Sequence, residues 1–283
     1  MYFMQLLVLG LLTGAVYGLI GVGFTLVLGI GHIPNFAQGA FVGLGLYFAL
    51  FMRDQFGLTP YEAFVPGLVF FALVGIGAAE LFERRGRKSG EIGELLVGLA
   101  LLLVIDGLLE VLYSDNPRAL HGVNLGVVEA FGVGIPWSNI IAAIFAVAVG
   151  VAMFWWISAT RWGRAMRAVT DNAMSAGLYG VRVPIIQRLS VTMSVALAGV
   201  AGILISPFTV MTPSLGDTFL ITAFAVVLVG SIGNTLGAVI AGLAIGVIDS
   251  ITGGYLASYW TTLAPLICIA VFLLVRKESV SVA

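Results

Sequence analysis

Charged residues are scarce in this sequence. Only 10% of its 283 residues are charged, 60% are hydrophobic, and the mean hydropathy is +1.11. A soluble domain carries roughly 25% charged residues, because its surface must be covered with groups that water solvates well. The scarcity therefore excludes an ordinary soluble protein and predicts one that is embedded in a membrane. The formal net charge of −1 also argues against a basic surface for nucleic acid.

Cysteine and histidine, which build disulfides and many metal sites, are nearly missing. Cys268 is the single cysteine, so no disulfide can form within the chain. His32 and His121 are isolated from each other and from any carboxylate cluster with ligand spacing, so we predict no metal site. No nucleophile and base form a catalytic constellation, and no G-x-x-x-x-G-K-[ST] motif is present. We therefore expect no enzyme, and no cofactor held by this chain.

Long apolar blocks are what the sequence has in abundance. A helix needs about 20 apolar residues to cross ~30 Å of hydrocarbon, so each block predicts a membrane span. The first block lacks a clear cleavage site, and we interpret it as a retained span. The blocks run over residues 6–30, 36–52, 63–82, 93–113, 136–159, 189–206, 219–229, 236–251 and 259–275. They predict an all-α, polytopic transmembrane helical bundle with eight or nine segments, forming a single domain over residues 1–283.

Two polar interruptions, at residues 31–35 and 230–235, cut this apolar pattern. Backbone that opens at membrane depth must be buried in protein or line a water-filled cavity. We therefore expect some segments to be broken or re-entrant. Asn35, Gln38 and Asn234 become candidate residues of a translocation path, and capping of the broken helix ends is the alternative.

Cations gather in three connections, which predicts the orientation of the chain. By the positive-inside rule these connections face the cytoplasm, and the C-terminus lies there with them. The side of the N-terminus depends on whether the first interrupted segment crosses fully. The cations are Arg84, Arg85, Arg87 and Lys88, then Arg161, Arg164, Arg167, Arg182 and Arg188, and finally Arg276 and Lys277.

Small residues recur at spacings of four, which favours close packing between helices. The series are Gly10, Gly14 and Gly18, then Gly39 and Gly43, Gly233 and Gly237, and Gly242 and Gly246. We interpret them as contacts within one bundle rather than as dimerisation motifs.

Three carboxylates fall inside apolar blocks. Asp106 and Glu110 are four residues apart on one helix face, and Asp249 lies late in another block. A charge at membrane depth costs about 2.5 kcal/mol or more, so such groups should face the bundle interior or water. Asp106 and Glu110 are candidates for a translocation path, although Glu110 is close enough to a polar loop to be simply solvated. Asp249 is a functional candidate whose role stays open.

The segment from Arg161 to Gly180 is basic and patterned. Thr170 or Asp171 is placed to cap a short helix that ends at Gly180. Small residues at Ala173, Ala176, Gly177 and Gly180 would leave one face of that helix nearly bare, so another surface could approach closely. From the spacing alone, a docking surface and a basic turn that only sets topology are both open.

At this point the chain resembles the branched-chain amino acid permease family of ABC importers, specifically the shorter of its two membrane subunits. Three passages carry the resemblance: residues 34–40, residues 163–180 and residues 230–242. It implies a multi-pass protein of a bacterial or archaeal inner (cell) membrane. It also implies a second related permease subunit, two cytoplasmic ATPase subunits that bind ATP and Mg, and an extracytoplasmic binding protein.

The resemblance implies that the middle passage is the segment that couples to the ATPase. That role falls on Arg164, Asp171, Asn172, Ala176, Gly177 and Gly180. Two features depart from the family pattern, which often has His where this chain has Gln38 and usually continues differently after Arg276. Branched-chain amino acids are the leading substrates. Urea, other amides and organic acids stay open, because permeases with similar frames serve them.

Two other functions are consistent with a bundle of this kind. In an ion-coupled secondary transporter, Asp106, Glu110 and Asp249 would be the coupling carboxylates. A passive channel or membrane scaffold would need neither these carboxylates nor the basic segment.

Overall fold

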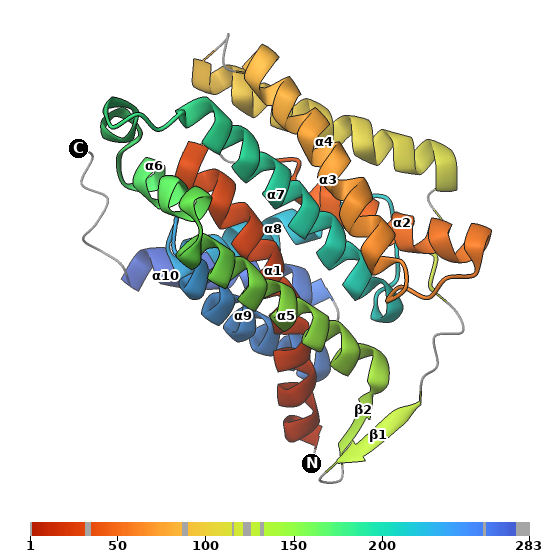
Figure 1. Cartoon of the computed structure of the whole chain (residues 1–283). Helices are drawn as coiled ribbons and strands as arrows, with labels where there is room; N and C mark the ends of the chain where they lie inside the picture. Colours follow the sequence, from red (N-terminus) through yellow and green to blue (C-terminus); the bar gives the residue numbers. More distant parts are fainter. Residues whose placement is uncertain are drawn as a thin grey trace.

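The structure is a computed structural model that describes residues 2–31, 35–86, 90–114, 116–120, 126–130, 133–256 and 259–275. Several residues discussed above lie outside this described part, namely His32, Pro34, Arg87, Lys88, His121, Arg276 and Lys277. The rest is almost entirely helical, which confirms the all-α, polytopic bundle (Figure 1).

Each of the nine predicted apolar blocks corresponds to one helix. These are α1 (Tyr2–Gly31), α2 (Gln38–Phe56), α3 (Phe64–Leu81), α4 (Gly90–Tyr113), α5 (Trp137–Ala159), α7 (Val183–Ile205), α8 (Leu215–Gly230), α9 (Thr235–Tyr255) and α10 (Tyr259–Val275). Among the described residues, six helices are long and apolar enough to span a bilayer alone, and α8 and α10 contribute shorter apolar helices. The predicted count of eight or nine membrane segments is therefore approximate.

Five further elements of the described chain lie between these helices. A π-helical turn, η1 (Phe82–Gly86), continues α3, and a 3-10 turn, η3 (Ser206–Phe208), ends α7. The amphipathic helix α6 (Arg161–Leu178) joins α5 to α7. The strands β1 (Val127–Ala130) and β2 (Val133–Pro136) form an antiparallel hairpin, which the sequence analysis did not predict.

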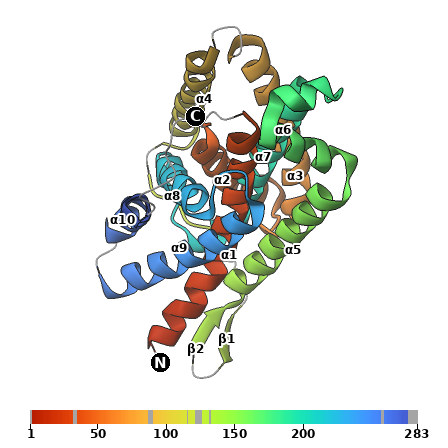
Figure 2. The same ribbon diagram turned by 90° about the vertical axis from the view of Figure 1, so that its left-hand side faces the viewer.

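Burial divides the helices into a centre and a periphery. Most of α1 and α7 is buried, whereas little of α4, α5 or α9 is. Figures 1 and 2 show α1 and α7 inside the bundle, with α4 and α10 on its outside. Apolar side chains along α4, such as Leu103, Val104 and Val111, are exposed. They suit contact with lipid or with another subunit, because water would be a poor solvent for them.

The most extensive helix contact among the described residues joins α1 to α9, far apart in the sequence. A Cβ atom added at Gly14 would lie 2.8 Å from the carbonyl oxygen of Gly242, and one added at Gly10 would lie 2.7 Å from Cα of Val247. Added atoms at Gly242 and Gly246 would collide with the α1 backbone in the same way. These glycines therefore serve packing within one chain, as predicted for the small-residue series.

The two ends of the bundle differ in what they carry. Figure 2 places the N-terminus and the β1–β2 hairpin at one end, and α6 with the neighbouring ends of α3 and α4 at the other. Exposed arginines gather at the α6 end, including Arg84 and Arg85 in η1 and Arg161, Arg164 and Arg182 in and after α6. The first two of the three basic segments that were predicted to share one side of the membrane thus share one end of the structure, and the cations of the third lie outside the described residues.

Candidate functional site

Helix α6 is tied firmly to the end of α5. The hydroxyl of Thr160 accepts a hydrogen bond from the backbone N–H of Gly163 at 3.1 Å and donates one to the carbonyl of Trp156 at 2.7 Å. Gly163 lies so close to the Ile157 backbone that a side chain there would collide with it. Arg167 reaches back to donate to the Ile157 carbonyl. The start of α6 therefore follows any movement of α5.

The helix is broken at Asn172, whose φ of −161° and ψ of 104° are not helical. The Asn172 side chain accepts a hydrogen bond from the N–H of Ser175 at 2.8 Å and so caps the short second part of the helix. The prediction that Thr170 or Asp171 makes this cap is wrong, because the hydroxyl of Thr170 bonds back to the Met166 carbonyl inside the first part. The predicted end is confirmed, since Gly180 has a φ of +86°.

The small-residue face of α6 points inward more than expected. Ala176 is buried, at 5% exposure, in an apolar cluster with Met166, Val169, Ile30 of α1 and Ile186 of α7. Ala173 is half-buried, and only Gly177 and Gly180 of the predicted face are exposed. The expectation of a bare face open to another protein is therefore wrong at Ala176, which anchors the helix to its own bundle.

The exposed side of the second part of α6 is apolar. Met174 is 84% exposed, Leu178 85% and Tyr179 90%. Water-exposed large apolar side chains that gather on one short helix are typical of a docking surface. Sequence analysis missed this α6 patch (Met174, Leu178 and Tyr179), although the spacing of four between Met174 and Leu178 was a signal for it. The candidate coupling residues Arg164, Asp171 and Asn172 are also exposed.

Helix α6 also contacts the second interruption. A Cβ atom added at Gly233 would lie 3.0 Å from the Thr170 methyl carbon, and one added at Gly29 of α1 would lie 3.4 Å from the same methyl. The backbone at the interruption is not helical, because Ser231 and Gly233 have positive φ values of 71° and 83°. Thr170 thus rests between the end of α1 and the turn that joins α8 to α9.

The polar residues of the two interruptions have different surroundings. Asn234 is exposed, and its side chain caps α9 by accepting from the N–H of Gly237 at 3.0 Å. Asn35 and Gln38 are almost completely buried, at 1% and 0% exposure. Gln38 accepts a hydrogen bond from the Ser194 hydroxyl of α7 at 2.7 Å, deep between α2 and α7. The structure therefore brings Asn35 and Gln38 together near the start of α2 and leaves Asn234 apart.

The three intramembrane carboxylates do not converge. Glu110 is exposed, Asp106 is half-buried on α4, and Asp249 of α9 accepts a hydrogen bond from the Tyr17 hydroxyl of α1 at 2.9 Å. In the part of the chain that the structure describes, no three His, Cys, Asp or Glu side chains are grouped as a metal site would need. Asp249 and Tyr17 instead join the two helices that the glycines bring together.

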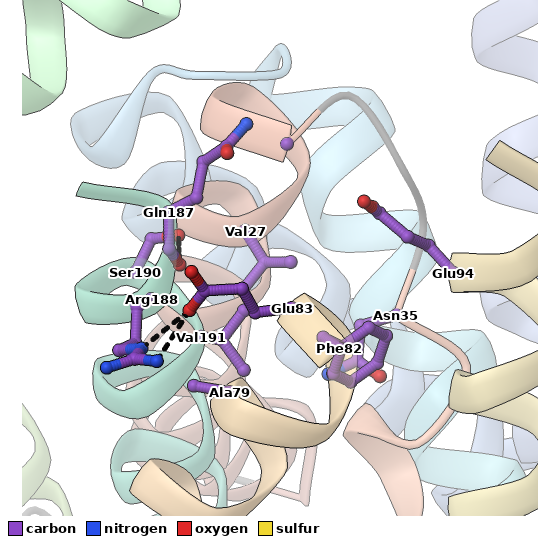
Figure 3. Close-up of a pocket in the computed structure, with 11 residues that line it drawn as sticks. Val27, Asn35, Ala79, Phe82, Glu83, Glu94, Gln187, Arg188, Ser190 and Val191 are labelled. Carbon is purple, nitrogen blue, oxygen red and sulfur yellow. Dashed lines mark hydrogen bonds and ion pairs between the residues drawn. The ribbon is translucent and has the colours of Figure 1, made fainter. Parts of the chain in front are cut away.

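A pocket opens beside Asn35, between α1, the end of α3, α4 and α7. Its polar lining includes Asn35, Glu83, Glu94, Gln187 and Arg188, and its apolar lining includes Val27, Ala79, Phe82 and Val191. Figure 3 shows the Glu83 carboxylate turned toward Arg188, with Asn35 beside the Phe82 ring. Arg188 Nε donates to Glu83 at 2.8 Å. Its terminal nitrogen Nη2 forms ion pairs with the carboxylates of Glu80 and Glu83. These ion pairs link α7 to the π-helical end of α3.

Comparison with known proteins places this arrangement in a family. Residues 6–276 match the family model described as "Branched-chain amino acid transport system / permease component". This chain belongs to that permease family. The match covers α1 to α10, so the family is shown for the bundle as a whole and for α6 within it.

Named relatives in this family are distant but align along most of the chain. The high-affinity branched-chain amino acid transport system permease protein LivH of Escherichia coli is 27% identical over 99% of this chain and 96% of its own length. The probable branched-chain amino acid transport permease protein LivH of Methanocaldococcus jannaschii is 29% identical over 86% of this chain and 79% of its own. BraD of Pseudomonas aeruginosa, a permease protein of the same kind of system, is 27% identical over 88% and 86%. No solved structure matches the chain.

Proposed function

We propose that this permease is the membrane-spanning subunit of an ATP-driven importer and that α6 is its coupling helix. The observation that carries the proposal is the exposed α6 patch at the basic end of the bundle, on a helix anchored to α1, α5 and α7. Cationic segments of a membrane protein face the cytoplasm, where an ATPase subunit would meet this patch. The same orientation places the C-terminus in the cytoplasm.

Coupling follows from how α6 is held. An ATPase that grips the α6 patch would move Thr170 against the end of α1 and the α8–α9 turn, and would move Ala176 against α7. Rigid elements transmit such a displacement as rocking of the packed helices, which opens a path to alternate sides. Ala176 acts as the anchor in this scheme, whereas Arg164, Asp171 and Asn172 flank the contact. Gly177 and Gly180 let the ATPase approach the backbone.

The partners and the solute are proposed from the family and from the names of the relatives. The pore needs a second, related permease subunit, two ATPase subunits supply ATP hydrolysis with Mg, and an extracytoplasmic binding protein delivers the solute. We propose a branched-chain or related amino acid, because the relatives from E. coli and M. jannaschii carry that description. The membrane is the inner, or cell, membrane. The whole chain acts as one permease domain.

Co-purification from mild detergent tests the coupling role. The double variant Met174→Glu, Tyr179→Glu charges the α6 patch without touching the buried face of α6. Burial of a large apolar side chain contributes about 1.5–3 kcal/mol, so we expect the variant to lose the bound ATPase by at least roughly tenfold. Val127→Glu, an exposed apolar position on the hairpin at the opposite end, is the matched control and should keep the ATPase.

Two outcomes would overturn this proposal. If the double variant retains the ATPase as well as the native chain, α6 is not the docking surface. If no ATPase accompanies even the native chain while Asp106→Asn abolishes uptake, an ion-coupled transporter takes the place of the importer. Ala176→Glu is unsuitable for this test, because it would place a charge in the buried cluster that holds α6.

A further inference from the structure

An apolar groove runs along the bundle between α5 and α9, with α1 as its floor. Figure 2 shows α1 lying between these two helices. The space measures about 170 Å³, every residue that lines it is apolar, and neither α1 nor α5 contains a charged residue. Because lipid tails are the solvent at membrane depth, such a groove suits a hydrocarbon chain. Its floor includes Leu19 of α1, and its walls include Val147, Val151 and Phe154 of α5 and Leu236 and Val239 of α9.

The side chains of the described residues leave this groove unfilled. Val151 and Leu236, on its two walls, are exposed at the surface of the bundle. Gly150 also lines the groove, and a Cβ atom added there would meet no described atom within 4 Å. The occupant of this space in the membrane is therefore apolar and comes from outside the part of the chain that the structure describes.

Helix α6 crosses one end of the groove. Its start is bonded to the end of α5 through Thr160, and the methyl carbon of Thr170 lies against Gly233, just before α9. At 1.5 Å per residue, the helix between these two contacts spans about 15 Å. Residues 147–154 of α5 lie about 9–20 Å from Thr160 along the helix. Since the hydrocarbon core is ~30 Å thick, the groove opens mainly in the half of the bilayer next to α6.

Two arginines on this crossing segment lack an anionic partner. Arg161 and Arg164 are both exposed, and neither forms an ion pair among the described residues. Arg164 donates a long hydrogen bond, 3.5 Å, to the carbonyl of Ala159. The groove walls supply no counter-charge, because α5 has no carboxylate and the one carboxylate of α9, Asp249, accepts from Tyr17. An anionic group beside the start of α6 gains two guanidinium partners.

Exposed tryptophans mark the level of the lipid head groups at this end. Trp155, near the end of α5, is 68% exposed, and Trp162, at the start of α6, is 50% exposed. Tryptophan gathers where hydrocarbon meets the head groups, because its ring is apolar and its N–H is polar. The two arginines therefore lie at the level of the head groups, and the groove lies among the acyl chains.

We propose that the groove holds an acyl chain of one anionic phospholipid of the cytoplasmic leaflet, with the head-group phosphate bound by Arg161 and Arg164. The cytoplasmic leaflet is the one that carries such lipids and attracts arginine. A zwitterionic lipid fits less well, because it brings its own cation to the two guanidinium groups. The bound lipid braces α5 against α9 beneath α6. This site goes beyond the proposed function and takes from it only the orientation of the α6 end.

Native mass spectrometry tests the site on the full chain, purified in mild detergent with whatever subunits accompany it. The probes are phosphatidylglycerol and phosphatidylcholine with identical acyl chains, each titrated to give a Kd. A single arginine near anionic lipid contributes a factor of about five. With two arginines at the site, we expect one phosphatidylglycerol to bind at least roughly tenfold more tightly than phosphatidylcholine.

Two variants, each with a matched control, separate the groove from the arginines. Gly150→Phe places a ring in the open space and should weaken phosphatidylglycerol at least tenfold. Gly107→Phe on α4, where an added Cβ atom also meets nothing within 4 Å, should leave binding unchanged. Arg161→Gln should weaken phosphatidylglycerol about fivefold and leave phosphatidylcholine unaffected. Arg182→Gln removes an exposed charge before α7, which does not line the groove, and should change neither Kd.

The inference is overturned if the native protein binds both lipids equally, or if Gly150→Phe binds phosphatidylglycerol as the native protein does. Equal losses in Arg161→Gln and Arg182→Gln would also overturn it, because they would show a diffuse attraction to charge. If Gly150→Phe instead releases another membrane subunit while the lipid count stays the same, a protein helix fills the groove and the lipid site is wrong. The Arg161→Gln result keeps the test decisive should Gly150→Phe fail to fold.

Discussion

Single glycines determine how closely the helices of this bundle approach one another. Gly242 is the clearest case, since any Cβ atom there would meet the backbone of Gly18 on α1. Overpacking of a well-packed site costs about 1–3 kcal/mol. We expect Gly242→Val to lower the free energy of unfolding by at least about 2 kcal/mol, as measured by thermal or denaturant unfolding in detergent.

Gly77 is the control for that substitution. It also lies within a helix, α3, but nothing lies within 4 Å of an added Cβ atom. Gly77→Val should therefore change stability little. Equal losses at Gly77 and Gly242 would show that helix propensity, rather than contact between α1 and α9, explains the effect.

Asn234 and Asn172 show how far the role of a single residue can be predicted from the sequence. Capping was one of two roles foreseen for Asn234, and the structure shows that cap. The cap inside α6 was assigned to Thr170 or Asp171 instead of Asn172. Neighbouring Thr, Asp and Asn all cap well, and which of them does so depends on where the backbone leaves the helix. Packing against α1 and α7 decides that point, and no local pattern contains it.

A prediction follows from the Asn234 cap. Asn234→Ala removes the acceptor for the N–H of Gly237 and should cost about 1 kcal/mol of stability. Asn234→Asp keeps an acceptor and should cost little. Thermal unfolding of both variants in the same detergent measures the difference, and equal losses would contradict a capping role.

At the scale of elements, the turn before α3 carries a pH-dependent contact. The Glu62 carboxylate accepts from the N–H of Thr59 at 2.7 Å and from its hydroxyl at 2.8 Å. These bonds hold the pKa of Glu62 below its ordinary value of 4.5. A lowered pKa means that the contact stabilises the fold fully above pH 4.5 and is lost as the pH falls through the lowered value.

Glu62→Gln tests this contact. The native chain should be more stable than the variant near pH 6, and the difference should shrink as the pH falls below about 4.5. The measurement is the melting temperature of both proteins in detergent across this range. A difference that does not change with pH would mean that the carboxylate charge contributes nothing to the turn.

Some elements of the fold could be predicted from the sequence and others could not. All nine apolar helices were predicted, because long apolar blocks have few other structures available to them in lipid. The β1–β2 hairpin was missed for two reasons. Its eight strand residues show no strong alternation of apolar and polar side chains, and the two residues between the strands are not a typical hairpin-turn pair. The inward side of α6 was misjudged because alanine and glycine fit a buried contact as well as an exposed one.

At the scale of the whole molecule, the distribution of arginine predicts its orientation. Labelling of single cysteines in a Cys268→Ser background tests this prediction in intact cells. A cysteine introduced at Val127, which is 61% exposed on the hairpin, should react with a membrane-impermeant maleimide. A cysteine at Tyr179 of the α6 patch should react only after the membrane is permeabilised. The opposite pattern would invert the topology and remove the proposed ATPase contact from the cytoplasm.

The contact between α1 and α9 also has a consequence for how the chain is made. Gly14 leaves the ribosome 228 residues before Gly242, its partner across this contact. At a synthesis rate of roughly 5–20 residues per second, roughly 10–45 s pass between the synthesis of α1 and that of the α9 surface that will cover its glycines. During synthesis α1 must therefore rest against lipid, an insertion factor or an earlier helix. Helix α1 is therefore synthesised well before α9, the helix that becomes its main partner.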